Sequence, residues 1–455
     1  MSQTVSNMER QRGLGKATVF RWVVLGLIFL IYTIATADRA NIGLALPFIR
    51  KDFPMTNTQA GALMSVFFIG YVVAMIPGGF LCAKYGVKRV LTVFVILTSV
   101  FTGLIGFAGS VLQIKLCRLG VGMAEGPVAV GMATTINNWF PPREKGLATG
   151  FFLASSQFGP LIVPPLSGLI ISYFGWRQIF WSFAIPGIIF SLVWFLLVND
   201  QPGKSRFCSP AELELIRTDK LVVGDRVRAP RPYRLWWLDR IIRARRIEPI
   251  DSTAKLFRSW NLIGCAMGYF FIIALTTILM SWIPTYLITV KKFAIMKMAF
   301  ASAAPFGGLV LGNLVGGWLS DNVLGKRRKP LMMLTALITS GLMYSLIYSS
   351  EQPLLLGTLL FVLGFLLALG FSAFIVYPMG LVAKPQFPVA FGIINVGGQL
   401  GGFCAPLAVG MILDKYNWNV VFMAMAACCI LCFLLVVTIV EPVDQPVSRP
   451  LPVAR

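Results

Sequence analysis

Twelve long apolar segments constrain the fold of this chain more than any other feature. Each has about 20 or more mainly apolar residues, the length that a helix needs to cross a hydrocarbon core of roughly 30 Å. The segments lack the alternating polarity of a membrane barrel strand. The sequence therefore predicts an all-α polytopic membrane protein with twelve transmembrane helices. The predicted spans are 22–46, 58–80, 88–108, 112–137, 146–171, 177–198, 259–288, 298–320, 330–349, 354–382, 388–412 and 419–440.

Basic residues are divided unevenly between the loops. The chain has 40 Lys and Arg residues. With the N-terminus in the cytoplasm, 30 of them lie on the cytoplasmic side, eight lie outside or at the outer rim, and Arg39 and Arg118 lie within spans. Because cytoplasmic loops carry the excess of Lys and Arg, both termini are expected in the cytoplasm. We expect a multi-pass protein of a bacterial cytoplasmic (inner) membrane.

Residues 199–258 form the one long polar segment. The predicted organisation is a cytoplasmic tail (1–21), a six-helix bundle (22–198), a cytoplasmic loop (199–258), a second six-helix bundle (259–440) and a cytoplasmic tail (441–455). Within the loop, residues 234–246 mix Trp and Ile with basic residues. This stretch fits a helix lying on anionic lipid, and it fits a solvated linker helix equally well.

The two halves repeat each other at a constant offset of 242 residues, which aligns 150–168 with 392–410. An internal duplication with six helices in each half predicts two bundles around a central cavity. A duplicated channel is the structural competitor. The identical pairs are Gly150/Gly392, Gln157/Gln399, Gly159/Gly401, Pro164/Pro406 and Gly168/Gly410.

Four charged residues lie deep within the predicted spans: Asp38, Arg39, Arg118 and Glu125. A charge at mid-membrane costs about 3 kcal/mol on insertion scales, so such groups are expected to face a cavity or one another. Adjacent helical residues diverge by about 100°, so Asp38 and Arg39 should have separate partners. Arg118 and Glu125 are seven residues apart and share a helix face. A purely structural pair of Asp38 with Arg118 is the competing interpretation.

The chemistry of these groups predicts a proton-coupled carrier of an organic anion. A guanidinium offers a planar fork of donors that fits a carboxylate. A carboxylate whose surroundings alternate can take up and release protons. The chain has no His, so Asp38 and Glu125 are the carboxylate proton carriers expected within the spans. No cofactor, metal or nucleic acid is expected, and the proton gradient would supply the energy.

Four motifs resemble the major facilitator superfamily: DRAN (38–41), IPGG (76–79), RLGVGMAEGP (118–127) and WFPPREKG (139–146). More narrowly, they resemble its anion:cation symporter family, which includes importers of galactonate, glucarate, hexuronates and phthalate. The resemblance implies that Arg39 binds the substrate carboxylate. It also implies that Asp38 and Glu125 are protonation sites and that Arg118 modulates Asp38.

Further residues match the family outside these motifs. Tyr71 matches a cavity tyrosine, and Gln157 and Asn395 match residues that contact sugar hydroxyls, although a helix-packing role for Gln157 stays open. The gating loop motif is represented by Arg89 and Asp321. Its first copy has Ala83 in place of the usual Asp, so a weaker gating contact is expected there. The tenth helix lacks the Trp that is frequent in sugar-acid carriers.

Other functions compete with uptake by symport. An organophosphate exchanger would resemble relatives with a basic residue after the first-helix Arg, where this chain has Ala40, and with an Arg in the seventh span, where 259–288 has no charge. A drug or cation exporter needs a cavity dominated by acidic residues, whereas in this chain two Arg balance the two acids within the spans. A transporter-like sensor would signal through 199–258. The sequence shows no set of nucleophile and base that would indicate an enzyme. A monomer is expected.

Overall fold

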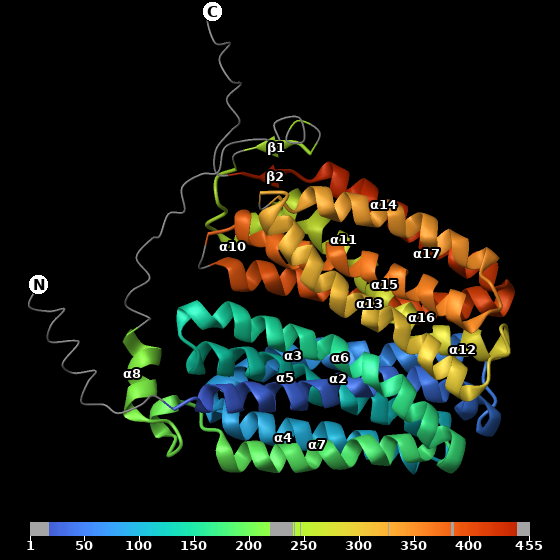
Figure 1. Cartoon of the computed structure of the whole chain (residues 1–455), viewed down its shortest axis with the longest axis horizontal. Coiled ribbons are helices and arrows are strands. Elements are labelled where there is room, and N and C mark those ends of the chain that lie inside the picture. The colour runs from blue at the N-terminus through green and yellow to red at the C-terminus, as the bar shows by residue number, and fades with distance from the viewer. Residues whose placement is uncertain are drawn as a thin grey trace, which may run out of the picture. The chain divides into compact units, whose positions relative to one another are not determined.

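A computed structural model describes residues 18–218, 240, 242–245, 247–325, 327–383 and 386–443. Within these ranges twelve helices are long and apolar enough to cross a membrane, which confirms the predicted number (Figure 1). The first predicted span ended at residue 46, but the first helix continues to Asp52 and includes Arg50 and Lys51 in its last turn. A helix can extend past the apolar run that marks the membrane span. The predicted tails (1–21 and 441–455) and the 234–246 stretch lie largely outside the described residues.

The first six spans are α2 (Phe20–Asp52), α3 (Asn57–Tyr85), α4 (Val87–Gly106), α5 (Val111–Trp139), α6 (Pro142–Phe174) and α7 (Arg177–Leu197). The other six are α11 (Trp260–Ser281) with its continuation α12 (Ile283–Thr289), α13 (Ile295–Asn322), α14 (Lys329–Ser345), α15 (Pro353–Val376), α16 (Phe387–Lys415) and α17 (Trp418–Thr438). The short elements are η1 (Pro202–Lys204), α8 (Pro210–Thr218), β1 (Ala244–Arg245), α10 (Thr253–Arg258), η2 (Leu346–Tyr348), η3 (Tyr377–Gly380) and β2 (Glu441–Pro442).

The described residues form two compact units. Unit 1 takes in the described parts of Met1–Arg39, Ile69–Pro160 and Phe174–Ala229. Unit 2 takes in Ala40–Phe68, Leu161–Tyr173 and the described parts of Pro230–Arg455. Helices α2, α3 and α6 are each divided between the two units. The division into bundles at 22–198 and 259–440 stays a prediction.

In unit 1, α4 packs against α5 and α7. Its core includes the fully buried indoles of Trp139 and Trp194. The start of α4 is capped by Asp200, whose carboxylate accepts the main-chain N–H of Lys88 at 2.7 Å. An acid at a helix N-terminus satisfies an open donor and complements the helix dipole. Helix α4 therefore begins with an acidic cap that comes from the loop after α7.

Unit 2 contains an equivalent cap. The Glu441 carboxylate accepts the main-chain N–H groups of Arg328 and Lys329 at the start of α14, at 2.9 and 2.7 Å. Glu441 lies in β2, which pairs in parallel with β1 (Figure 1). Burial raises the pKa of Glu441, opposed by these two main-chain bonds. Each acid follows the sixth span of its half, so the duplication extends to helix capping.

Duplicated glycines mark places where helices approach closely within each unit. In unit 1, a methyl group on Gly159 of α6 would lie 2.5 Å from the Thr33 carbonyl oxygen of α2. In unit 2, a methyl group on Gly401 of α16 would lie 2.1 Å from the Phe270 carbonyl oxygen of α11. Small residues allow such contacts between membrane helices. These two glycines are therefore required by packing at equivalent positions of the repeat.

The C-terminus of α16 docks on the N-terminus of α3 within unit 2. Asp414 accepts the main-chain N–H groups of Asn57 at 2.8 Å and Thr58 at 2.9 Å. In return, the Asn57 side-chain amide donates to the Leu413 carbonyl at 3.1 Å. The Arg50 guanidinium also donates to the Asn57 side chain, at 2.8 Å. This junction joins the last turn of one span to the first turn of another.

Candidate functional site

The four charged residues predicted within the spans gather in unit 1. Asp38 and Arg39 come from α2, and Arg118 and Glu125 come from α5. Asp38, Arg118 and Glu125 have 4%, 2% and 0% of their surface exposed, and the Arg39 side chain has 18% exposed. Their formal charges cancel, which lowers the cost of placing them in an apolar surrounding.

Arg39 and Glu125 form an ion pair. The Arg39 Nε donates to Glu125 Oε1 at 2.9 Å, and Nη2 donates to the same oxygen. The second carboxylate oxygen, Oε2, is buried and has no hydrogen-bond partner among the described residues. On the other side, the Arg39 guanidinium carbon lies 5.0 Å from the centroid of the Tyr71 ring, a favourable cation–π distance. The pair leaves one acceptor of the carboxylate unfilled.

Asp38 has different partners. Its Oδ2 accepts the Thr102 hydroxyl of α4 at 2.7 Å. Arg118 Nη1 donates to the main-chain carbonyl of Asp38 at 3.0 Å, which places this guanidinium beside the residue that it is predicted to modulate. The expectation of separate partners for Asp38 and Arg39 is confirmed. Thr102 was not anticipated, because a single threonine in an apolar helix carries no signal in the sequence.

The remaining predicted residues are less informative. Gln157 on α6 in unit 1 and Asn395 on α16 in unit 2 are both half-buried, and the Asn395 amide donates to the Phe391 carbonyl at 3.1 Å. Arg89 is exposed in the first turn of α4. The side chain of Asp321 lies outside the described residues. The structure thus brings Tyr71 to the charged cluster, and the roles of the other four stay predictions.

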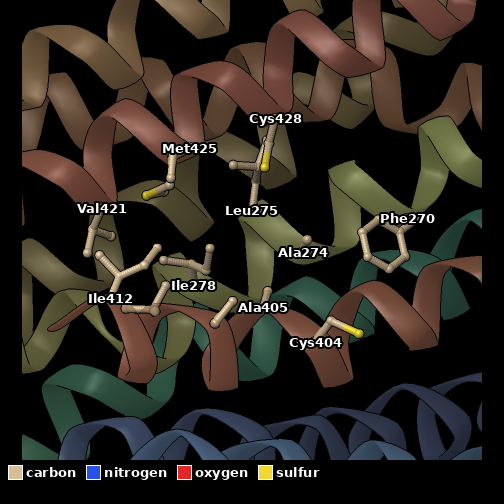
Figure 2. Close-up of a pocket in the computed structure, with 13 residues that line it drawn as sticks. Phe270, Ala274, Leu275, Ile278, Cys404, Ala405, Ile412, Val421, Met425 and Cys428 are labelled. Atoms are coloured by element: carbon tan, nitrogen blue, oxygen red, sulfur yellow. The ribbon is translucent and has the colours of Figure 1, made fainter. Parts of the chain in front are cut away.

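A cavity of about 140 Å³ lies in unit 2 among α11, α16 and α17 (Figure 2). Its labelled side chains carry only carbon and sulfur, so they offer an anion no charge and no strong hydrogen-bond donor. This cavity is therefore unsuited to an anionic substrate. Its lining includes Phe270, Leu275, Ile278, Cys404, Met425 and Cys428.

Three known transporters are similar to this chain over most of its length. A probable galactarate/D-glucarate transporter of Escherichia coli (strain K12) is 25% identical over 98% of this chain and 99% of its own. A D-galactonate transporter of Escherichia coli O6:H1 is 28% identical over 88% of this chain and 90% of its own. The crystal structure of a D-xylose-proton symporter matches with a TM-score of 0.70 and 16% identity, over 92% of this chain and 98% of that one.

The pattern of the Major Facilitator Superfamily matches residues 28–386 and 298–454. The predicted resemblance to this superfamily and to its sugar-acid carriers is thereby confirmed, and the structural match supports the twelve-helix fold. The family consists of transporters, so the chain is a membrane transporter and not an enzyme. The chain belongs to the Major Facilitator Superfamily.

Proposed function

We propose that this transporter imports a small organic anion of the sugar-acid class together with protons, by alternating access. The ion pair between Arg39 and Glu125 carries the proposal. Arg39 is the more exposed of the two guanidiniums, with 18% of its side chain accessible, and Glu125 is fully buried against it. A substrate carboxylate needs the donors that Glu125 already occupies, so anion and proton binding are linked at a single guanidinium.

Glu125 and the substrate carboxylate compete for Arg39, and this competition sets the order in which the proton and the substrate bind. While Glu125 is ionised, it neutralises Arg39, and a second carboxylate meets both an occupied donor and a like charge. A proton on Glu125 removes that charge. The buried Oε2 has no partner among the described residues, so the proton can be accepted there without breaking an existing hydrogen bond. Arg39 then keeps an unbalanced charge that a substrate carboxylate neutralises.

The proposed substrate class rests on the relatives and on the polar residues that the family resemblance assigns to substrate binding. Relatives that share most of this chain's length include transporters named for galactarate, D-glucarate and D-galactonate. Tyr71 contacts Arg39, while Gln157 and Asn395 supply amides that can both donate to and accept from hydroxyl groups. A polyhydroxy acid would use one charged contact and several neutral ones.

Uptake into proteoliposomes tests the proposal. Labelled D-galactonate and D-glucarate are offered with the lumen made alkaline, and accumulation is expected to collapse when the pH gradient is removed. Glu125→Gln mimics the protonated carboxyl, so it should abolish accumulation while it still exchanges labelled for unlabelled substrate. Glu351→Gln makes the same change at an exposed position and should behave as the unmodified protein.

Two outcomes would reject symport. If Glu125→Gln still accumulates substrate against a gradient, Glu125 is not the coupling site. If the unmodified protein exchanges substrate but never accumulates it in response to a pH gradient, the protein is an exchanger, the alternative that the sequence left open.

A further inference from the structure

The hydrogen bond between Thr102 and Asp38 joins two buried side chains from different helices. Thr102 is 1% exposed and Asp38 is 4% exposed. The hydroxyl oxygen lies 2.7 Å from Asp38 Oδ2, a normal distance for a hydroxyl that donates to an oxygen acceptor. The contact is far from solvent, so water competes little for it.

Thr102 departs from the usual behaviour of threonine in helices. A buried threonine commonly donates to the carbonyl four residues earlier in its own helix. One turn before Thr102, Thr98 does this by donating to the Phe94 carbonyl at 2.8 Å. Thr102 instead donates across to α2. The same local bond is made by Thr92, Thr135, Thr276, Thr289 and Thr335.

The charges around Asp38 come mainly from α5. Arg118 donates to the main-chain carbonyl of Asp38, and Glu125 is engaged with Arg39 on α2. The charged residues of α4 and α7 are Lys88, Arg89 and Arg177, all in the first turns of their helices. The hydroxyl of Thr102 is a neutral donor that α4 presents to the Asp38 carboxylate.

We infer that Thr102 is a positioning residue that holds Asp38 in its ionised form and thereby sets the pH range in which Asp38 exchanges its proton. The inference rests on the proposed function, in which Asp38 is one of two proton carriers. During exchange, a proton from water binds an Asp38 carboxyl oxygen and later returns to water, while Thr102 keeps its own proton. Protonation weakens the bond from Thr102, so this hydroxyl opposes proton binding.

Infrared titration of purified protein, without substrate, tests the inference. The absorption of the protonated carboxyl is followed against pH, and the band lost in Asp38→Asn is assigned to Asp38. Thr102→Val removes the donor and should move the midpoint of this band up by about one pH unit, the effect expected for a charge-assisted bond. Thr102→Ser keeps the hydroxyl and should restore the original midpoint.

Thr98→Val is the matched control, since Thr98 is equally buried on α4 and donates within its own helix. Its midpoint should not move. Should Thr102→Val fail to fold, Thr102→Cys supplies a weaker donor, and an intermediate upward shift is expected.

Three results would overturn the inference. They are an unchanged midpoint in Thr102→Val or Thr102→Cys, an equal shift in Thr98→Val, and no Asp38-dependent band over the pH range in which the protein stays folded. The proposed function fails separately, if uptake does not depend on the pH gradient. In that case the infrared midpoints still decide the role of Thr102.

Discussion

At the scale of single residues, the planar shape of the Arg39 guanidinium matters as much as its charge. Nε and Nη2 both donate to one oxygen of Glu125, the fork arrangement that lysine cannot reproduce. Arg39→Lys should therefore weaken binding of D-galactonate and D-glucarate by roughly tenfold or more, the loss of one charge-assisted hydrogen bond. Calorimetry on purified protein measures this. Arg206→Lys, at an exposed position, should bind normally, and equal binding by Arg39→Lys would contradict a two-pronged contact.

The sequence predicted the charged members of this cluster but not the ion pair between Arg39 and Glu125. Asp38, Arg118 and Glu125 stood out because ionisable groups are costly in apolar spans. Helix geometry predicted that Asp38 and Arg39 diverge, but it left open whether Arg118 pairs with the Asp38 carboxylate. The structure shows Arg118 donating to the main-chain carbonyl of Asp38. Thr102 was missed, since the choice between a local and a cross-helix bond depends on packing.

At the scale of helices, the junction of α16 with α3 provides a test of capping. Asp414 satisfies two open N–H groups at the start of α3 and complements its dipole. Asp414→Asn removes the negative charge and one of the two acceptor oxygens, which should cost about 1 kcal/mol. Main-chain hydrogen exchange over 57–68 should therefore become about fivefold faster. Lys415→Gln changes the adjacent exposed residue and serves as the control. Exchange that is unchanged in Asp414→Asn would show that the cap does not stabilise this end of α3.

Helix number and the duplicated glycines were predictable, whereas the helix caps were not. Apolar runs of spanning length and identical residues at a fixed offset can be read along the chain. Gly401 is one of these duplicated glycines, and its close approach to the Phe270 carbonyl shows the packing role of the repeated position. Asp200, however, lies 112 residues from the Lys88 N–H that it caps. An acid this distant from its helix gives no local signal, and the weaker gating contact expected from Ala83 stays a prediction.

At the scale of the whole molecule, the relatives and the twelve helices define a transporter, and the charge cluster suggests how its cycle is coupled. The charge cluster consists of two buried acids and two guanidiniums whose formal charges cancel. The positions of the duplication equivalent to Arg118 and Glu125, aligned on the L-G step, are Val362 and Leu369. The fold therefore does not require charges at these sites. Proton coupling would then belong to one half of the repeat, while substrate contacts are predicted in both.

Two proton carriers predict how transport responds to voltage. If Asp38 and Glu125 each carry one proton, a cycle with monovalent D-galactonate moves one net positive charge inward, whereas a cycle with divalent D-glucarate moves none. A potential of 100 mV is worth about 2.3 kcal/mol per charge. An inside-negative potential of that size should raise D-galactonate accumulation by up to about fiftyfold and leave D-glucarate accumulation unchanged. Potassium gradients with valinomycin set the potential in proteoliposomes, and liposomes without protein report leakage. An equal response of the two acids would contradict a stoichiometry of two protons.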